Sequence, residues 1–172
     1  TYYSDKMFVL RNRMESKNYE DIDEADLIPS LYLKTMKELY DSRKSDKDVI
    51  ELADRVLNSS VFLDPYIIGE IRYFLCSALA REKNPRFKEE VQSIDGAQHT
   101  FLFGFYYRHI GQYEYAIKKL EEVLLEHPNY PQAKRELVRV YGITENYEKA
   151  LILAKENYEG NPSNEYHIHA YY

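Results

Sequence analysis

The strongest constraint on how this chain folds is a pattern that repeats within its second half. From Ala97 onward, two segments align with each other when the sequence is shifted by 34 residues. The matching pairs are Tyr107 and Tyr141, Tyr113 and Tyr147, Glu114 and Glu148, Ala116 and Ala150, Glu122 and Glu156, and Pro128 and Pro162. Self-similarity at a fixed period of this length is typical of stacked units, each of which buries its apolar face against the next. The pattern therefore predicts a repeating architecture in this half of the chain.

Helical periodicity runs through the rest of the chain, and residues that favour helix starts interrupt it. Asp64-Pro65 joins a capping side chain to a favourable first helical position, and Asn84-Pro85 repeats the device. No alternating pattern of the strand type reaches a useful length. The expected helices begin at Ser4 or Asp5, run from about Leu27 to Tyr40, begin again at Ser45 or Asp46, run from Pro65 to about Arg81, and follow Pro85 to near Gly96. The fold class is predicted to be all-α.

The two segments related by the shift resemble tetratricopeptide repeats, in which antiparallel helix pairs stack into a superhelical α-solenoid. In the first segment, the large, small, aromatic and proline positions of that family are occupied by Phe103, Gly104, Tyr107, Gly111, Ala116, Leu120, Val123 and Pro128. The small Gly104 and Ala116 let the two helices approach closely, and Pro128 ends the second helix because proline cannot continue it. The second segment departs from the pattern at Val138, which replaces the small glycine, and at Asn157, where a small apolar residue is expected.

The resemblance covers about residues 97–172. A length of 172 residues suits one sizeable core, so one helical domain over 1–172 is expected. The expected parts are an irregular helical N-terminal or capping part, 1–96, two repeats, 97–130 and 131–164, and the start of a third repeat or capping helix, 165–172. An irregular part is expected because the ends of a solenoid need covering. Since the sequence has no initial Met and stops within a helical pattern, we expect it to be a piece of a longer protein.

Charge and hydropathy argue against several classes of partner. The formal net charge of -6 disfavours general attraction to nucleic acid or to an anionic membrane surface. No run approaches the roughly 20 apolar residues of a membrane-spanning helix, and no signal peptide is recognisable. The single cysteine, Cys76, lies in an apolar run, which predicts a buried and inert thiol. These features favour a cytoplasmic location.

The sequence contains no recognisable catalytic set, metal site or cofactor motif. There is no Gly-rich phosphate loop, no GxSxG and no HExxH. His167 and His169 would point about 200° apart on a helix, so one metal ion cannot take both. Paired catalytic carboxylates need a sheltered cleft, whereas Glu121-Glu122 is expected on a solvated face. We therefore expect a protein that is not an enzyme and that binds no cofactor.

In the family that the repeats resemble, the first helix of each pair lines a concave groove that holds a partner. Carried over residue by residue, the groove positions fall on Gln98, Phe101, Phe105, Arg108 and His109 in the first repeat and on Gln132, Arg135 and Arg139 in the second. Helical spacing supports this grouping, because Arg135 and Arg139 share one helix face, as do Phe101, Phe105 and Arg108. Arginines bind carboxylates and exposed phenylalanines act as anchors, so the implied partner is a protein or peptide with acidic and apolar residues.

Alternatives stay open for these residues and for the whole chain. If the face is structural, Phe101 and Phe105 are covered by the N-terminal helices and the arginines pair with neighbouring glutamates. The chain is either a protein-interaction scaffold or adaptor, or a regulatory or sensor module of a larger, bacterial protein whose helices pack on an effector domain. Self-association through the C-terminal helix is a further hypothesis, because an exposed apolar side at Ile168, Tyr171 and Tyr172 would favour it.

Overall fold

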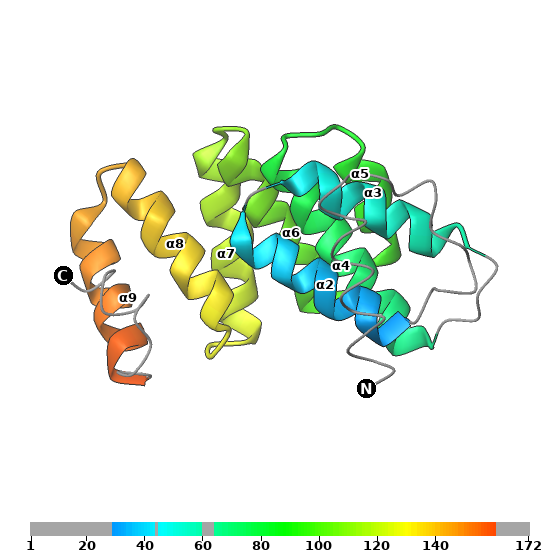
Figure 1. The fold of residues 1–172 in the computed structure, drawn as a ribbon. Coiled ribbons are helices and arrows are strands. Elements are labelled where there is room, and N and C mark those ends of the chain that lie inside the picture. Colours follow the sequence, from blue (N-terminus) through cyan, green and yellow to red (C-terminus); the bar gives the residue numbers. More distant parts are fainter. Residues whose placement is uncertain (1–28, 44, 60–63, 161–172) are drawn as a thin grey trace. The chain divides into compact units, whose positions relative to one another are not determined.

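The computed structural model describes residues 29–43, 45–59 and 64–160, and all regular secondary structure within them is helical (Figure 1). This confirms the all-α class for the described part of the chain. The helix expected near Ser4 or Asp5 and the apolar side at Ile168, Tyr171 and Tyr172 lie outside the described residues. The chain divides into two compact units, with the boundary between Ile94 and Asp95, and each unit is described separately below.

The first unit is built around three helices that pack on one another. Its elements are α2 (Pro29–Ser42), α3 (Asp46–Leu57), α4 (Pro65–Arg81), the single turn α5 (Phe87–Glu90) and the 3₁₀ turn η3 (Val91–Ser93). Its largest fully buried side chains are Tyr32, Met36, Leu52, Ile71, Leu75, Leu79 and Phe87. The helix expected from Pro85 to near Gly96 is shorter than predicted. Regular α-helix ends at Glu90, and the chain then tightens into η3.

The caps expected from the sequence begin two of these helices. The Ser45 hydroxyl accepts a hydrogen bond from the Asp48 amide at 3.3 Å, and Asp64 Oδ1 accepts one from the Tyr66 amide at 2.8 Å. Each satisfies an amide that the helix leaves without an internal partner. Both predicted helix starts are confirmed.

Two features of α4 complete the first unit. Cys76 is buried, as expected, and desolvation raises the pKa of its thiol to about 12. At the end of α4, the Arg81 guanidinium donates to the Tyr40 carbonyl at 2.9 Å and to Asp46 Oδ1 at 2.6 Å. Arg81 thereby joins the end of α2 and the start of α3 to α4 with charge-assisted hydrogen bonds.

The second unit contains two consecutive helix pairs. They are α6 (Gly96–His109) with α7 (Tyr113–Glu126), and α8 (Pro131–Ile143) with α9 (Tyr147–Gly160). Neighbours in sequence pack on each other, and successive helices run in opposite directions, so that α7 and α9 run in the same direction on either side of α8 (Figure 1). The second helices of the two pairs begin at Tyr113 and Tyr147, which are separated by the 34-residue shift seen in the sequence.

The turn inside each pair has the same backbone geometry. Gly111 and Glu145, again one shift apart, have positive φ angles of 81° and 63°. The following amides, those of Gln112 and Asn146, donate back to the Tyr107 and Tyr141 carbonyls at 2.9 and 2.8 Å. This left-handed residue followed by a six-to-one hydrogen bond is the Schellman ending of a helix.

Gly104 marks a close approach of α6 to α7. A Cβ atom at this position would lie 2.7 Å from Leu120 Cγ and 2.8 Å from Leu120 Cδ2, which is closer than atoms can pack without movement. Ala116 and Leu120 on α7 are fully buried. The role expected of the two small residues, to bring the helices of the pair together, is confirmed for Gly104.

Candidate functional site

The aromatic residues predicted for the concave groove are buried rather than exposed. Phe101 and Phe105 on α6 retain 4% and 7% of their accessible surface. Their rings stack with centroids 6.0 Å apart, Tyr130 lies 5.5 Å from Phe101, and His109 lies 4.4 Å from Phe105. The expectation that these phenylalanines are exposed anchors is therefore wrong, since their surface is already used in packing.

Two of the predicted arginines share one buried carboxylate. Glu136 on α8 is 5% exposed and pairs with Arg108 from α6 and, at 3.1 Å, with Arg139 one turn further along α8. The Arg108 guanidinium also lies 5.6 Å from the centre of the Phe105 ring. The structural alternative, in which arginines pair with a neighbouring glutamate, is confirmed for these two. Arg135 lies on the same helix and is half-buried.

The predicted glutamines line a cavity at the turn between α7 and α8. Gln98 and Gln132 surround a space of about 640 Å³ together with the turn itself, residues 126–131. Within this turn, burial raises the pKa of the Tyr130 hydroxyl. The structure thus separates the predicted groove residues other than Arg135 into a buried aromatic row, an ion-pair cluster and a cavity at the α7–α8 turn.

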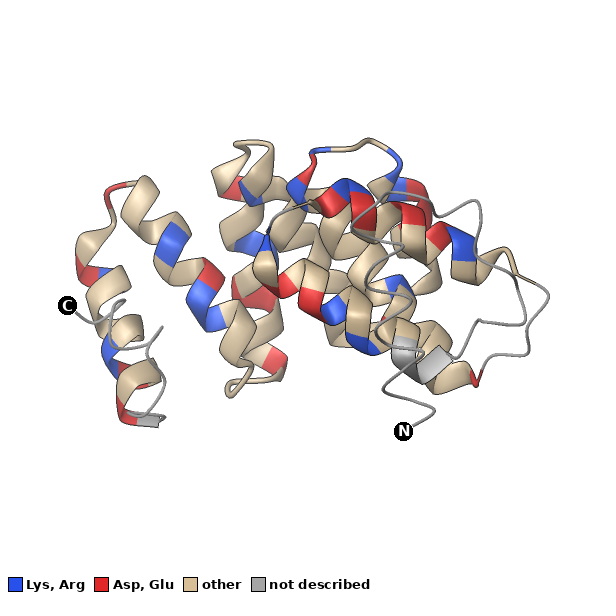
Figure 2. Ribbon diagram, viewed as in Figure 1, with Lys and Arg blue, Asp and Glu red and all other residues tan. Residues whose placement is uncertain are grey.

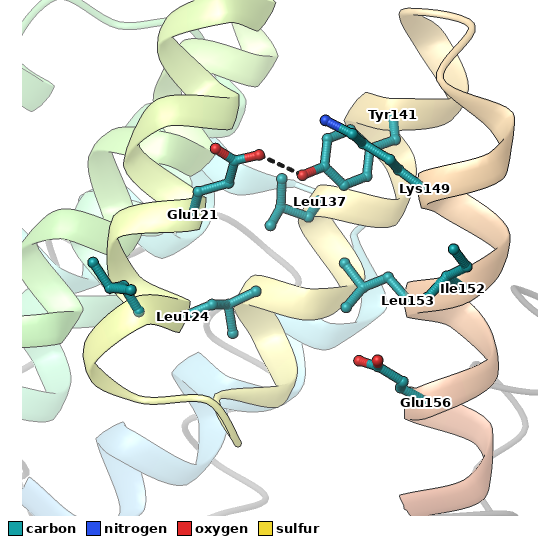
Figure 3. A pocket seen from close by; sticks show the side chains of 9 residues that line it. Glu121, Leu124, Leu137, Tyr141, Lys149, Ile152, Leu153 and Glu156 are labelled. Atoms are coloured by element: carbon teal, nitrogen blue, oxygen red, sulfur yellow. Dashed lines mark hydrogen bonds between the residues drawn. The ribbon is translucent and has the colours of Figure 1, made fainter.

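A different surface of the second unit combines exposed apolar side chains with a hollow. We call it the α7–α9 groove, a cavity of about 410 Å³ whose floor is α8 and whose walls are α7 and α9 (Figure 3). Its lining comes from α7 (Glu121, Leu124, Leu125), α8 (Leu137, Tyr141) and α9 (Lys149, Ile152, Leu153, Glu156). Leu124 and Leu153 point into the space between the two walls (Figure 3).

The groove is apolar where it is most exposed. Leu125 retains 84% and Ile152 retains 55% of its accessible surface, whereas Leu137 on the floor is almost fully buried. Large apolar side chains are not unusual singly on a protein surface, but a rim of them around a hollow is typical of binding sites. The arrangement can therefore hold an apolar ligand of the size of several side chains.

One end of the groove is polar and ordered by hydrogen bonding. The Tyr141 hydroxyl donates to the Glu121 carboxylate at 2.6 Å, and the Lys149 ammonium lies 5.8 Å from the centre of the Tyr141 ring (Figure 3). Burial raises the pKa of Tyr141, with further contributions from the hydrogen bond and the charge of Glu121. These contacts fix the orientation of the ring at the junction of all three helices.

Reactive chemistry is not assembled in the groove. Across the described ranges, no three His, Cys, Asp or Glu side chains are placed to hold a metal ion, and no helix is long and apolar enough to cross a membrane. The groove instead offers apolar contact, two exposed carboxylates and one ammonium group. Such a set of groups suits recognition.

The sequence carried a signal for this groove that the repeat pattern obscured. One buried face per helix needs apolar residues about every three or four positions. The ends of the second helices exceed this, with Val123-Leu124-Leu125 in α7 and Leu151-Ile152-Leu153 in α9. In each run only part of the apolar surface is buried. Leu124, Leu125, Ile152 and Leu153 line the groove, whereas Leu151 is exposed outside it.

Comparison of the chain with family models, with curated proteins and with solved structures gives no match. The resemblance to tetratricopeptide repeats therefore rests on the residues of this chain alone.

Proposed function

We propose that this chain is a protein-interaction scaffold and that its binding site is the α7–α9 groove. The observation that carries the proposal is the hollow itself, walled by Leu125 and Ile152, which are exposed although they are large and apolar. Burying such side chains against a partner contributes roughly 25 cal/mol per Å² of apolar surface. In many interfaces a few well-packed residues contribute most of the binding energy.

The proposal includes a repeat architecture for α6 to α9. The common helix starts, the identical turns at Gly111 and Glu145 and the close approach at Gly104 support two tetratricopeptide-like units of a solenoid. Solenoids present extended surfaces made of equivalent positions from successive repeats. The groove fits this principle, because it lies between the two equivalent helices α7 and α9.

Neighbouring positions on α9 provide a matched test. Leu151 and Ile152 are 57% and 55% exposed, yet only Ile152 lines the groove. The chain is used to capture proteins from native extract, a captured partner is identified and purified, and its affinity is measured for the original chain, Ile152→Asp and Leu151→Asp. We expect Ile152→Asp to weaken binding at least about tenfold, equivalent to about 1.4 kcal/mol, and Leu151→Asp to bind like the original chain.

Equal binding by the two variants would show that the groove is not the site. Circular dichroism of each variant confirms that the comparison is between folded proteins, which is expected because both side chains are exposed.

A further inference from the structure

The charge around the α7–α9 groove has a direction along its length. Lys149, in the first turn of α9, lies at the end of the groove where Tyr141 meets Glu121. Glu156 lines the opposite end, next to the C-terminal turns of α7 and α9. The groove is thus anionic towards the helix C-termini, whereas at the opposite end the charges of Lys149 and Glu121 offset each other.

The two helix ends strengthen the anionic end. The last turns of α7 and α9 contain no basic residue, and Glu126 ends α7 (Figure 2). The carbonyl groups of a helix C-terminus carry partial negative charge, which basic side chains usually offset. Because α7 and α9 run in the same direction, both C-termini lie towards the end of the groove that Glu156 lines and add partial negative charge there.

From this distribution we infer that the groove takes an amphipathic helix of another protein, with basic residues at the end that lies beside Glu156. The inference rests on the proposed function and specifies the partner. An apolar stripe on the incoming helix contacts Leu124, Leu125, Ile152 and Leu153, which is the helix-in-groove mode of recognition. Basic side chains at one end meet Glu156 and the partial negative charge of the helix C-termini.

The charge balance selects this occupant over a second copy of the chain. The chain has a formal net charge of -6, so two copies repel each other over distances of the order of the Debye length, about 10 Å at 0.1 M salt. A partner with a basic end is instead attracted. Complementary charge of this kind affects the choice of partner and the association rate more than it affects total affinity.

The test uses designed peptides as probes against the whole chain. Three fluorescent peptides of about 18 residues, or about five helical turns, share one composition of uncharged residues. The first has a Leu/Ile stripe and Lys residues at one end, the second has the same stripe with Glu in place of Lys, and the third has the Lys residues but a scrambled stripe. Fluorescence anisotropy measures their affinities at low and high salt.

We expect the Lys peptide to bind at least about tenfold more tightly than the Glu peptide at low salt, with the difference shrinking as salt screens the charges. The scrambled peptide should not bind, and Ile152→Asp should abolish binding of the Lys peptide. Glu156→Lys should remove most of the preference for the Lys peptide. Glu148→Lys, which makes the same charge change at a position outside the groove lining, should leave that preference in place.

Failure of this inference is distinguishable from failure of the proposed function. Equal binding of the Lys and Glu peptides, abolished by Ile152→Asp, would overturn the basic-end partner and leave the groove as a binding site. Binding of no peptide would also overturn it, and the groove would then be judged by the Leu151 and Ile152 comparison with the natural partner. Self-association of the chain in sedimentation that is lost in Ile152→Asp would make a second copy the occupant and overturn the inference as well.

Discussion

At the scale of the residue, the contact between Gly104 and Leu120 shows how closely one side chain is matched to another. An alanine at position 104 would place its Cβ within 2.8 Å of two Leu120 carbons. Alanine favours helix over glycine by about 1 kcal/mol, but overpacking costs about 1–3 kcal/mol. We expect Gly104→Ala to lower the free energy of unfolding, measured by urea denaturation, and an increase would show that Leu120 moves aside freely.

The second helix pair carries the complementary arrangement of sizes. The positions 34 residues after Gly104 and Leu120 are Val138 and Ala154, so at these equivalent positions the larger residue is on the first helix and the smaller one on the second. The sequence pattern alone presented Val138 as a departure from the repeat. The double variant Gly104→Val with Leu120→Ala transfers this pair to the first repeat. It should lose less unfolding free energy than the sum of the two single variants, because contacting residues couple by about 0.5–3 kcal/mol. Additive costs would contradict a size exchange.

Asn157 is a second departure from the repeat, and here the structure shows a cost. It is 5% exposed and occupies the position of the buried Val123 one repeat earlier, and within the described part of the chain its Nδ2 has no hydrogen-bond partner. A buried donor without a partner costs about 1–3 kcal/mol. Asn157→Val should therefore raise the urea midpoint, and Val123→Asn should lower it. A lower midpoint for Asn157→Val would indicate that the amide is satisfied in solution.

At the scale of the element, the turns that join paired helices have one conformation with two different residues. Gly111 adopts positive φ freely, whereas Glu145 adopts it against a cost of about 1–2 kcal/mol for a residue with a side chain. Replacing Glu145 by glycine removes this cost, but it also increases the conformational entropy of the unfolded chain, which offsets part of the gain in stability. Glu145→Gly is thus expected to raise stability by about 0.5–1 kcal/mol, and Gly111→Glu should lower it, as thermal unfolding of both variants would show. A loss of stability in Glu145→Gly would mean that the side chain makes a compensating contact.

Between elements, Glu136 holds α6 and α8 together through charge. Its buried carboxylate balances Arg108 and Arg139, so that Glu136→Gln leaves two guanidinium groups without their shared partner. Removing one partner of a fully buried ion pair lowers the free energy of unfolding by about 3–5 kcal/mol. We expect a somewhat smaller loss for Glu136→Gln, because Arg139 is partly exposed. Glu122→Gln is the control, because Glu122 pairs with Lys119 on the surface and exposed pairs contribute about 0–1 kcal/mol. Equal unfolding free energies for the two variants would show that the cluster has no structural role.

How far each element was predictable depends on the range of the forces that form it. The caps at Ser45 and Asp64 involve amides two or three residues away, so the local sequence sufficed to place them. The common starts of α7 and α9 followed from the repeat. The burial of Phe101 and the sharing of Glu136 by two arginines depend on residues distant in sequence, which a pattern on a single helix cannot reveal.

At the scale of the whole molecule, the same reasoning explains why the α7–α9 groove was not predicted. The family pattern directs attention to the first helix of each pair, whereas the groove is walled by the second helices. Its signal was the surplus of apolar residues at Leu124-Leu125 and Ile152-Leu153. Whether such a surplus is buried or left exposed is decided by the helices that pack around it, and only the structure shows that a hollow remains.

The division into two units leads to a prediction about folding. Within residues 95–172, α6 to α9 share their own buried side chains, including Leu102, Leu120 and Val140, and their own long-range polar contacts, such as the bond from Tyr141 to Glu121. Nearest-neighbour packing is the main source of stability in repeat proteins, so a stretch with two complete helix pairs has the contacts that it needs. We therefore expect residues 95–172, produced alone, to be helical by circular dichroism and to unfold cooperatively on heating. A fragment without a cooperative transition would show that the first unit supplies an essential part of its stability.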